Sequence, residues 1–431
     1  MARALIPTKT REKGIVVGLA TARGERARAE EYLDELGLLA DTAGVSVIHR
    51  ILQERDRVDS ATYIGSGKAE EIGWLVRRDE IDAVIFDEDL SPVQVRNLEK
   101  VIACKVLDRA GLILDIFASR AKSKEAMTQV ELAQLQYLLP RLTRQWTHLS
   151  KQYGGVGTKG PGETQIETDR RAIRARISHL KNHLVKISKE REVQRKGRRN
   201  FTRVALVGYT NAGKSTLMNA LSHADVLVED RLFATLDAVA RRVNLSAGHT
   251  ILLTDTVGFI RKLPPHLIAS FKSTLAEVQE ADILLHVVDV SHPGFAEHIA
   301  VVEETLAELN VLTKPAVLVF NKIDRLPDRL LIPELTRRYN HAVFVAAARL
   351  INIRALELKI EEFLDIEVAE EELCIPQKEY GIISKIYEWA EVIDKQYEDN
   401  SVRIRFRLQK KDSEKLLKLL GNLKAAARLK D

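Results

Sequence analysis

The chain has 431 residues, which is long enough for two to four domains that each bury a core of their own. Apolar residues make up 45% of it but occur in short runs, and none approaches the ~18 residues of a membrane-spanning helix. The net charge is only +5, yet residues 170–203 hold 13 Lys and Arg against 2 Glu. The basic character is therefore concentrated in one segment.

The cysteines and the first residues bear on the cellular compartment. Cys104 and Cys374 are far apart and fit no metal or disulfide pattern. The start, MARALIPTKTREKG, lacks the apolar core of a secretion signal. We therefore expect a reduced, cytoplasmic protein without a membrane span.

Residues 14–121 alternate between strand-like and helix-like runs. The strand-like runs cover residues 14–20, 45–52, 81–87 and 104–108, and the helix-like runs cover residues 26–39, 67–79 and 91–102. Pro92 takes the first position of the last of these helices, where its missing N–H is tolerated. This rhythm predicts an α/β domain with a mostly parallel sheet covered by helices.

Two apolar stripes with helical spacing follow, separated by the glycine-rich stretch YGGVGTKGPGET. The first stripe comprises Leu132, Leu135, Leu139, Leu142, Trp146 and Leu149, and the second comprises Ile173, Ile177, Leu180, Leu184 and Ile187. Steps of three and four residues predict a long antiparallel helical hairpin with the glycines at its tip. Pro140 interrupts the first stripe, and we expect a kink there.

The rest of the chain resumes the strand–helix alternation and then changes character. After an acidic stretch, residues 371–431 indicate a small unit of strand, helix, strand and helix, in which apolar residues alternate with Arg403, Arg405 and Arg407. That alternation is typical of a strand with one buried face. The predicted organisation is an N-terminal α/β domain, a helical hairpin, a second α/β domain and a C-terminal α+β domain, over residues 1–124, 125–199, 200–366 and 367–431.

The segment TRVALVGYTNAGKSTLMNAL predicts an apolar strand, a loop and a helix. Its loop fits the pattern GxxxxGK[ST] through Gly208, Gly213, Lys214 and Ser215. The glycines let backbone N–H groups surround phosphates, Lys214 adds positive charge, and the Ser215 hydroxyl is a ligand for Mg²⁺. The flanking strand and helix disfavour the alternative of a mere glycine-rich turn.

Two later strands end in residues that complete a nucleotide site. ILLTDTVGF contains Asp255, which would hold Mg²⁺ through water, and Gly258, whose N–H would meet the γ-phosphate. AVLVFNKID ends in Asn321, Lys322 and Asp324. The Asp324 carboxylate matches the N1–H and amino group of guanine, donors that adenine does not present there. The predicted ligand is therefore GTP and not ATP.

Three further segments bear on the predicted site. Thr235, in RLFATLDAVARRV, is the candidate switch threonine that closes on Mg²⁺ when the γ-phosphate is present, with a surface-loop threonine as the alternative. In VFVAAARL, backbone N–H groups of residues 346–348 would contact the base. Phe259 stands where many GTP hydrolases carry a water-orienting glutamine.

The prediction assigns catalysis to Lys214, Thr235 and Gly258, and metal binding to Ser215, Thr235 and Asp255. Nucleotide contacts are expected from five segments, comprising Gly208, Tyr209, Thr210, Asn211, Ala212, Gly213, Lys214, Ser215; Phe233, Ala234, Thr235, Leu236, Asp237; Asp255, Thr256, Val257, Gly258; Asn321, Lys322, Ile323, Asp324; and Ala346, Ala347, Ala348.

Taken together, the motifs resemble those of translation-factor-like P-loop GTPases. The segments DRAGLILDIFASRA, QVELAQLQYLLPRL and GGVGTKGPGETQIETDRR are similar to the HflX family, and this resemblance runs from about residue 14 to the C-terminus. It implies GTP-dependent action on the large subunit of the bacterial ribosome near the peptidyl-transferase centre. The implied outcome is the splitting or rescue of stalled or idle 70S ribosomes. We expect a Mg²⁺-dependent GTPase that acts as a monomer.

The chain departs from the family pattern in two places. Where the family usually has proline and threonines after FATLD, this chain has Ala238, Val239 and Ala240. In the last motif, a usual serine and two usual glycines are replaced by Ala346, Leu350 and Asn352. The family shares an apolar residue at the position of Phe259, so the resemblance implies an active enzyme with slow intrinsic hydrolysis that its partner accelerates.

The basic segment has two interpretations. Arg170, Arg171, Arg174 and Arg176 lie beside the predicted tip, which favours contacts to RNA phosphates without sequence readout over a merely solvated face. The tip itself, Gly154 to Gly162, is longer than a hairpin needs, which favours a functional loop over a flexible link. The arginines of the C-terminal strand form either a second contact or a solvated face.

Two weaker signals do not indicate sites. The GSGK sequence at residues 65–68 has Thr62 and Ala69 where a phosphate loop needs Gly and Ser or Thr, and we interpret it as a loop leading into a helix. His286 lies in an apolar strand and is expected in the core.

Two functions compete with the ribosome-acting switch. One is a nucleotide-using or RNA-modifying enzyme in the N-terminal domain, including ATP use, which the family resemblance leaves open. The other is a passive factor for assembly or binding of the large subunit.

Overall fold

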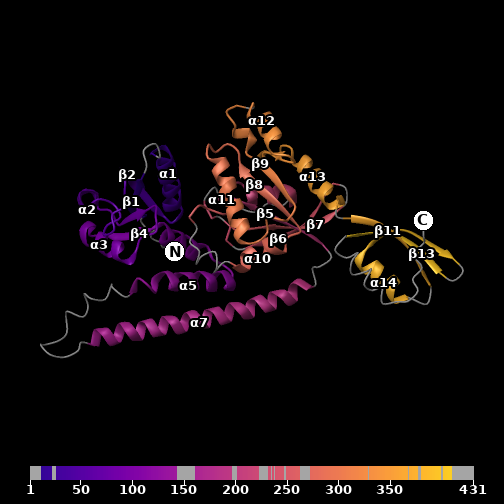
Figure 1. Ribbon diagram of the computed structural model, residues 1–431, viewed down its shortest axis with the longest axis horizontal. Coiled ribbons are helices and arrows are strands. Elements are labelled where there is room, and N and C mark those ends of the chain that lie inside the picture. The colour runs from indigo at the N-terminus through magenta and orange to yellow at the C-terminus, as the bar shows by residue number, and fades with distance from the viewer. Residues whose placement is uncertain are drawn as a thin grey trace, which may run out of the picture.

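The elements of the molecule form three sheets that follow one another along its length (Figure 1). The computed structural model describes residues 11–21, 26–142, 161–196, 201–222, 232–233, 235–236, 238–246, 249–262, 272–328, 330–366, 368–376, 380–398 and 401–409. Among the described helices, none is long and apolar enough to cross a membrane. The α/β fold class, with a small C-terminal α+β unit, agrees with the prediction.

The N-terminal domain contains the expected parallel sheet, with strand order β2-β1-β3-β4. Its strands are β1 (Glu12–Ala20), β2 (Val45–Glu54), β3 (Ala83–Phe86) and β4 (Lys105–Asp108). One face of the sheet is covered by α2 (Ser66–Asp79) and α3 (Pro92–Ile102), and the other by α1 (Arg26–Thr42) and α4 (Arg109–Arg120). Pro92 is the first residue of α3, as the sequence predicted, and the Ser91 side chain caps the helix.

Helices α5 (Lys124–Leu138) and α7 (Pro161–Lys196) lie side by side as the predicted antiparallel hairpin (Figure 1). The predicted apolar stripe is the least exposed face of α7, and an ion pair of 2.7 Å joins Arg176 on α7 to Glu131 on α5. At Pro140, where we expected a kink, the helix is interrupted: α5 ends at Leu138, and a turn over residues 139–141 precedes a helical residue at Leu142, because proline supplies no N–H to the preceding turn. Trp146, Leu149 and residues 154–160 lie outside the described residues, while Gly162, the last residue of the predicted tip, belongs to the start of α7.

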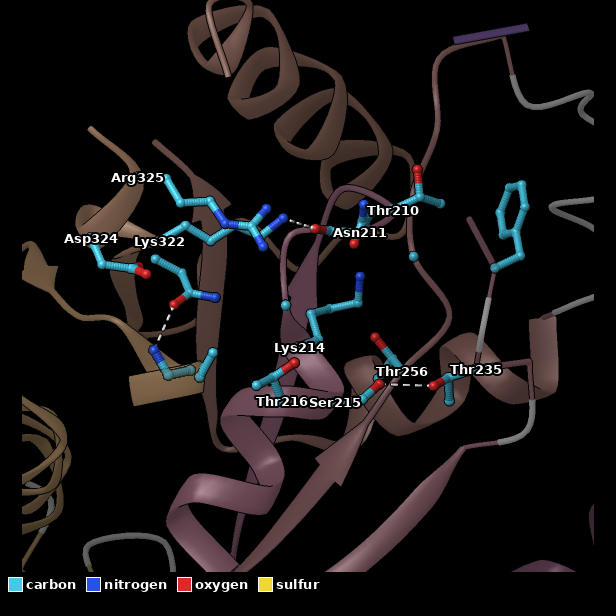
Figure 2. Close-up of a pocket in the computed structure, with 16 residues that line it drawn as sticks. Thr210, Asn211, Lys214, Ser215, Thr216, Thr235, Thr256, Lys322, Asp324 and Arg325 are labelled. Atoms are coloured by element: carbon cyan, nitrogen blue, oxygen red, sulfur yellow. Dashed lines mark hydrogen bonds between the residues drawn. The ribbon is translucent and has the colours of Figure 1, made fainter. Parts of the chain in front are cut away.

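The central domain is built on a six-stranded sheet with the order β10-β9-β8-β5-β7-β6, in which only β6 is antiparallel. Its strands are β5 (Thr202–Gly208), β6 (Val239–Asn244), β7 (Thr250–Asp255), β8 (Ile283–Asp289), β9 (Ala316–Asn321) and β10 (Val343–Phe344). The loops after β5, β7 and β9 meet at one edge of this sheet (Figure 2).

Helices cover both faces of the central sheet. One face carries α8 (Lys214–Ser222) and α13 (Ile353–Ile366), and the other carries α10 (Lys272–Glu280) and α11 (Phe295–Glu308). Three shorter helices complete the domain: η2 (Ile323–Arg325), α12 (Leu331–Arg338) and η3 (Ala347–Arg349).

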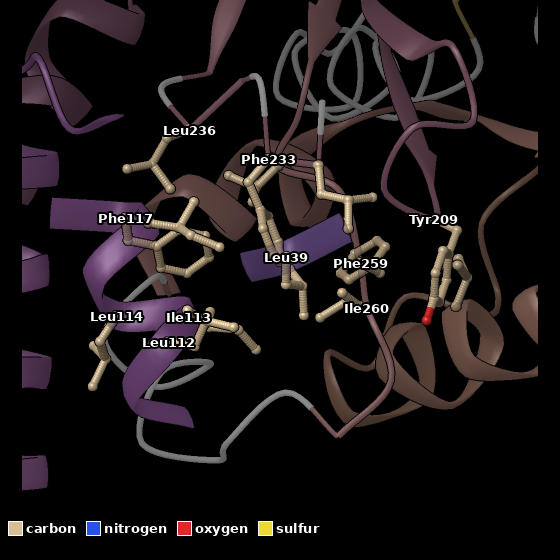
Figure 3. Packing of buried hydrophobic residues seen from close by; sticks show 14 of the residues in the cluster. Leu39, Leu112, Ile113, Leu114, Phe117, Tyr209, Phe233, Leu236, Phe259 and Ile260 are labelled. Atoms are coloured by element: carbon tan, nitrogen blue, oxygen red, sulfur yellow. The ribbon is translucent and has the colours of Figure 1, made fainter. Parts of the chain in front are cut away.

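One continuous apolar core joins the N-terminal and central domains (Figure 3). Helices α1 and α4 contribute Leu39 and Phe117, and the segments before β6 and after β7 contribute Phe233 and Phe259. The rings of Phe117 and Phe233 meet edge to face with centroids 4.7 Å apart. Phe259 is only 2% exposed, so its side chain belongs to the contact between the two domains.

The C-terminal unit is a three-stranded antiparallel sheet with the order β11-β13-β12 and one helix. Its elements are β11 (Val368–Pro376), α14 (Tyr380–Trp389), β12 (Glu391–Glu398) and β13 (Ser401–Gln409). Val402, Ile404 and Phe406 are buried on one face of β13, as the alternation predicted. The sequence analysis missed β12, an edge strand, and the helix expected after β13 lies outside the described residues.

The burial of Phe259 predicts its tolerance to substitution. Phe259→Gln should lower the free energy of unfolding by about 3–5 kcal/mol, because it removes apolar packing and buries an amide without partners. Phe259→Leu keeps the site apolar and should cost about 1.5 kcal/mol. Urea unfolding of both variants beside the parent chain measures the difference. Equal losses for the two substitutions would contradict the burial.

Candidate functional site

The loop between β5 and α8 has the backbone of a phosphate-binding loop. Gly213 has φ +92°, and a Cβ there would lie 2.3 Å from the side-chain nitrogen of Asn321. At Gly208, a Cβ would lie 2.2 Å from the carbonyl oxygen of Val287. Only glycine fits these two positions, so the spacing found in the sequence reflects close backbone packing.

Lys214 is the first residue of α8 and is buried beneath this loop. Its Nζ donates to the carbonyl oxygens of Gly208 at 3.0 Å and Tyr209 at 2.8 Å. Burial lowers the pKa of Lys214 to about 8, against an opposing effect of the Asp255 carboxylate. The ammonium therefore sits at the base of the pocket.

Three predicted metal ligands converge beside Lys214. The Ser215 hydroxyl donates to Asp255 Oδ2 at 2.6 Å and lies 2.8 Å from Thr235 Oγ1 (Figure 2). Asp255 Oδ1 is buried and has no hydrogen-bond partner in the described part of the chain. Burial raises the pKa of Asp255, while Lys214 and Ser215 oppose that rise. Two hydroxyls and one carboxylate form a hard oxygen donor set that suits Mg²⁺.

The segment after β9 reaches the same pocket from the opposite side. Asn321 donates to the carbonyl oxygen of Ala212 at 2.9 Å and accepts from the backbone N–H of Ala347 at 3.0 Å. Lys322 Nζ donates to the carbonyl oxygen of Asn211 at 2.8 Å. Asn321 thus ties together the three loops that surround the predicted base site.

Asp324, the predicted guanine-selecting carboxylate, lies in η2 with its side chain largely buried. Arg349 Nε is 3.0 Å from its Oδ2. The loop that carries Arg349 continues through two residues with left-handed backbones, Leu350 with φ +56° and Asn352 with φ +61°. These are the two positions at which the resemblance to the HflX family implies glycine.

A pocket of about 220 Å³ is lined by most of the predicted residues (Figure 2). The predicted residues that line it are Thr210, Asn211, Gly213, Lys214, Ser215, Phe233, Thr235, Thr256, Gly258, Asn321, Lys322, Asp324, Ala347 and Ala348. Thr216 and Arg325 also line the pocket and were not predicted, although each directly follows a motif residue. Their adjacency to Ser215 and Asp324 was the available signal.

Some predicted residues contribute to the surroundings and do not line the pocket. Tyr209, Leu236, Val257 and Ala346 are buried with their side chains in the protein interior, because each precedes or follows a pocket residue on the opposite side of its loop. Gly208, Ala212, Asp255 and Ile323 also stand behind the lining. Ala234 and Asp237 lie outside the described residues.

Gly258 and Phe259 occupy opposite sides of their segment. A Cβ at Gly258 would lie 2.8 Å from Thr210 Cα and 3.0 Å from Lys214 Nζ, so a side chain there would fill the pocket. The next residue pairs with the phosphate loop through its backbone: Phe259 N–H donates to Gly208 at 3.1 Å, and Thr210 N–H donates to Phe259 at 2.7 Å. The Phe259 side chain consequently points into the core between the domains.

Two signals that the sequence analysis set aside stay outside the pocket. His286 is buried in β8, and burial lowers its pKa to about 4. The GSGK segment forms the start of α2, with Gly65 as the residue before the helix. Neither lines the pocket.

Three family models match successive parts of the chain. Residues 30–118 match one described as GTP-binding GTPase N-terminal, residues 120–198 match GTP-binding GTPase Middle Region, and residues 203–322 match 50S ribosome-binding GTPase. A GTPase HflX from Caldanaerobacter subterraneus is 43% identical over 92% of this chain and 91% of its own length. The GTPase HflX of Escherichia coli is 43% identical over 90% and 92%.

This chain belongs to the HflX family of GTPases. A GTPase HflX from Flavobacterium psychrophilum is 54% identical over 73% of this chain and 76% of its own length. A solved GTP-binding protein from Sulfolobus solfataricus in complex with GDP is 25% identical, with a TM-score of 0.44 over 82% of this chain and 99% of its own. The predicted family and the GTPase activity are confirmed.

The lowered pKa of Lys214 predicts how GDP affinity depends on pH. Phosphates bind the protonated ammonium, so affinity should be constant near pH 7 and fall by up to about tenfold per pH unit above about pH 8. Calorimetric titration between about pH 6.5 and 9.5 tests this prediction.

Guanosine is the matched control for this titration, because it contains the ionisable guanine N1–H and lacks the phosphates. The ratio of GDP to guanosine affinity should therefore decline above about pH 8. A ratio that stays flat would contradict a role of the Lys214 ammonium in phosphate binding.

The left-handed backbone of Leu350 predicts a stabilising substitution. Leu350 is 66% exposed, so Leu350→Gly sacrifices little packing and should raise the free energy of unfolding by about 1 kcal/mol. Asn352→Gly should have a smaller effect, because asparagine tolerates this conformation better than leucine. Thermal unfolding measures both. A loss of stability in Leu350→Gly would show that the leucine has packing contacts of its own.

Proposed function

We propose that the chain uses GTP hydrolysis to bind the large ribosomal subunit and to separate or rescue stalled or idle 70S ribosomes. The observation that carries the proposal is the match of residues 203–322 to a family described as a 50S ribosome-binding GTPase. We further propose a cytoplasmic monomer that contacts structured RNA near the peptidyl-transferase centre without reading its sequence.

The basic helix α7 supports an RNA-binding role for the hairpin. Arg171 and Arg174 are exposed and Arg170 is half-buried, while Arg176 is engaged by Glu131. The first three are therefore our candidates for phosphate contacts, and Arg176 is assigned to holding the hairpin together.

The arginines of β13 favour the alternative of a solvated face. Arg405 lies opposite Glu372 on β11 and Asp394 on β12. Arg403 Nη1 is 3.4 Å from Glu372 Oε1. Cross-strand carboxylates offset the positive charge of this face, which makes it a poor electrostatic match for RNA.

In the proposed reaction, backbone N–H groups of residues 210–215 surround the phosphates, and Asp324 selects guanine. Lys214 places its ammonium at the β- and γ-phosphates. Mg²⁺, held by Ser215, Thr235 and Asp255, would neutralise charge on the phosphates. Thr235 and the N–H of Gly258 respond to the γ-phosphate.

Hydrolysis requires that the attacking water be aligned, and position 259 places no side chain in the pocket to do so. Because Phe259 faces the core, we propose that the ribosome completes the arrangement and accelerates a slow intrinsic reaction. This separates the proposed switch from a passive assembly factor, for which turnover would not matter.

GTP turnover with and without purified large subunits, at one defined salt concentration, tests the proposal. We expect at least about tenfold stimulation, which corresponds to about 1.4 kcal/mol of barrier lowering. Intact GTP binding without stimulation would remove the ribosome from the mechanism. That result would favour the alternative of an enzyme activity in the N-terminal domain.

Charge-reversal variants, measured in the same turnover assay, test which arginines contact the ribosome. The triple variant Arg170→Glu, Arg171→Glu, Arg174→Glu should lose the stimulation and keep the intrinsic rate. The double variant Arg403→Glu, Arg405→Glu is the matched control and should keep both. Lys214→Ala, in parallel, should abolish ribosome separation; separation that survives in Lys214→Ala would favour the passive factor.

A further inference from the structure

A buried group of polar side chains crosses the boundary between the N-terminal and central domains. It consists of Glu35 on α1, Asp87 after β3, Arg109 at the start of α4, Tyr209 in the phosphate loop and Arg261 after Phe259. We name these five residues the Glu35 cluster. The residues predicted for the nucleotide site do not include the three members from the N-terminal domain, and none of the three lines the nucleotide pocket.

Glu35 is the member that contacts both domains at once. Its carboxylate accepts a hydrogen bond from the Tyr209 hydroxyl, pairs with Arg109, and lies 3.3 Å from Arg261 Nε. Asp87 closes the group, since Arg109 Nη1 donates to it at 2.8 Å and Arg261 Nη2 donates at 3.2 Å. The two guanidiniums thus share the same two carboxylates.

The burial of these charges makes their pairing obligatory. Arg109 is 1% exposed and Arg261 is 7% exposed. Burial alone would raise the pKa of Glu35, but the guanidiniums of Arg109 and Arg261 hold it below its usual range. Two positive and two negative charges balance, and removing one would leave an uncompensated charge in the interior.

The cluster is connected directly to the phosphate loop. The Tyr209 hydroxyl, which donates to Glu35, accepts from the backbone N–H of Arg261 at 3.1 Å. Arg261 follows Gly258 by three residues, and Tyr209 precedes Thr210, which lines the pocket. Glu35 therefore ties helix α1 to both the phosphate loop, through Tyr209, and the segment that follows Gly258, through Arg261.

The packing between the two domains also reaches the segment of Thr235. Thr235 lies 2.8 Å from Ser215, and Phe233, two residues earlier, packs on Phe117 of the N-terminal domain. Apolar packing holds surfaces together but is non-directional, whereas hydrogen bonds to Glu35 permit a single register. Holding that register keeps Thr235 beside Ser215.

We propose that Glu35 is a positioning residue for GTP hydrolysis, contributed by the N-terminal domain, which acts through Tyr209 and Arg261 on the segment of Gly258. The proposed effect of Glu35 is on the transition state of GTP hydrolysis. Guanine and phosphate contacts come from other residues, so binding of GDP does not depend on Glu35.

Two substitutions that retain side-chain shape test the proposal in the full chain. Glu35→Gln and Tyr209→Phe should each lower kcat of intrinsic GTP hydrolysis about tenfold, with KM for GTP and Kd for GDP changed by less than about twofold. The double variant should be no slower than the slower single variant, because both changes break the same link. Tyr209→Phe keeps every charge in place and maintains the test if Glu35→Gln fails to fold.

Glu31→Gln is the matched control. Glu31 lies on the same helix and also faces the central domain, 3.6 Å from His292, but its contact is exposed and does not reach the phosphate loop. It should leave kcat unchanged. An unchanged or increased kcat in both test variants would overturn the proposal. A parallel loss of kcat and GDP affinity would also overturn it, because that pattern indicates general loosening.

Discussion

The backbone pairing of Phe259 with the phosphate loop is the constraint on which the rest of the site depends. Both polar backbone groups of Phe259 are used by Gly208 and Thr210, so the segment runs alongside the loop as a short added strand. A side chain at position 259 must then leave on the side away from Gly258. The apolar residue at this position is therefore a structural requirement of the domain contact. Since the Phe259 side chain faces away from the pocket, it cannot take the place of a water-orienting glutamine that faces the pocket.

The same constraint gives the N-terminal domain a part in shaping the pocket. Phe233 and Phe259 flank Thr235 and Gly258, and both rings are buried against α1 and α4. Movement of either segment away from the pocket would expose apolar surface and separate the charges around Glu35. Because interiors are closely packed, such a contact favours discrete arrangements over gradual drift. The two domains and the segments that carry Thr235 and Gly258 are thus expected to change state together.

The sequence predicted those features that local spacing encodes. The phosphate loop, the helices of the N-terminal domain and the buried stripe of α7 follow from periodicity and from glycines that backbone packing requires. The Glu35 cluster was not predictable, because Glu35 and Tyr209 are 174 residues apart and a carboxylate in a charged helix normally faces solvent. Strand β12 was missed for a related reason: its side chains Ile393, Asp394 and Tyr397 are exposed at a sheet edge, so the alternation was hidden.

Charge distribution links the fold to the proposed contact with RNA. The net charge of +5 combines a strongly basic segment, residues 170–203, with a remainder that is acidic. An RNA surface therefore attracts α7 and repels much of the molecule, which orients the protein before any close contact forms. Within α7, the pairing of Arg176 with Glu131 removes one cation from that interaction and uses it to hold α5 against α7. The hairpin can then present its remaining basic face as a stiff element, and the phosphates meet arginines whose positions are already set.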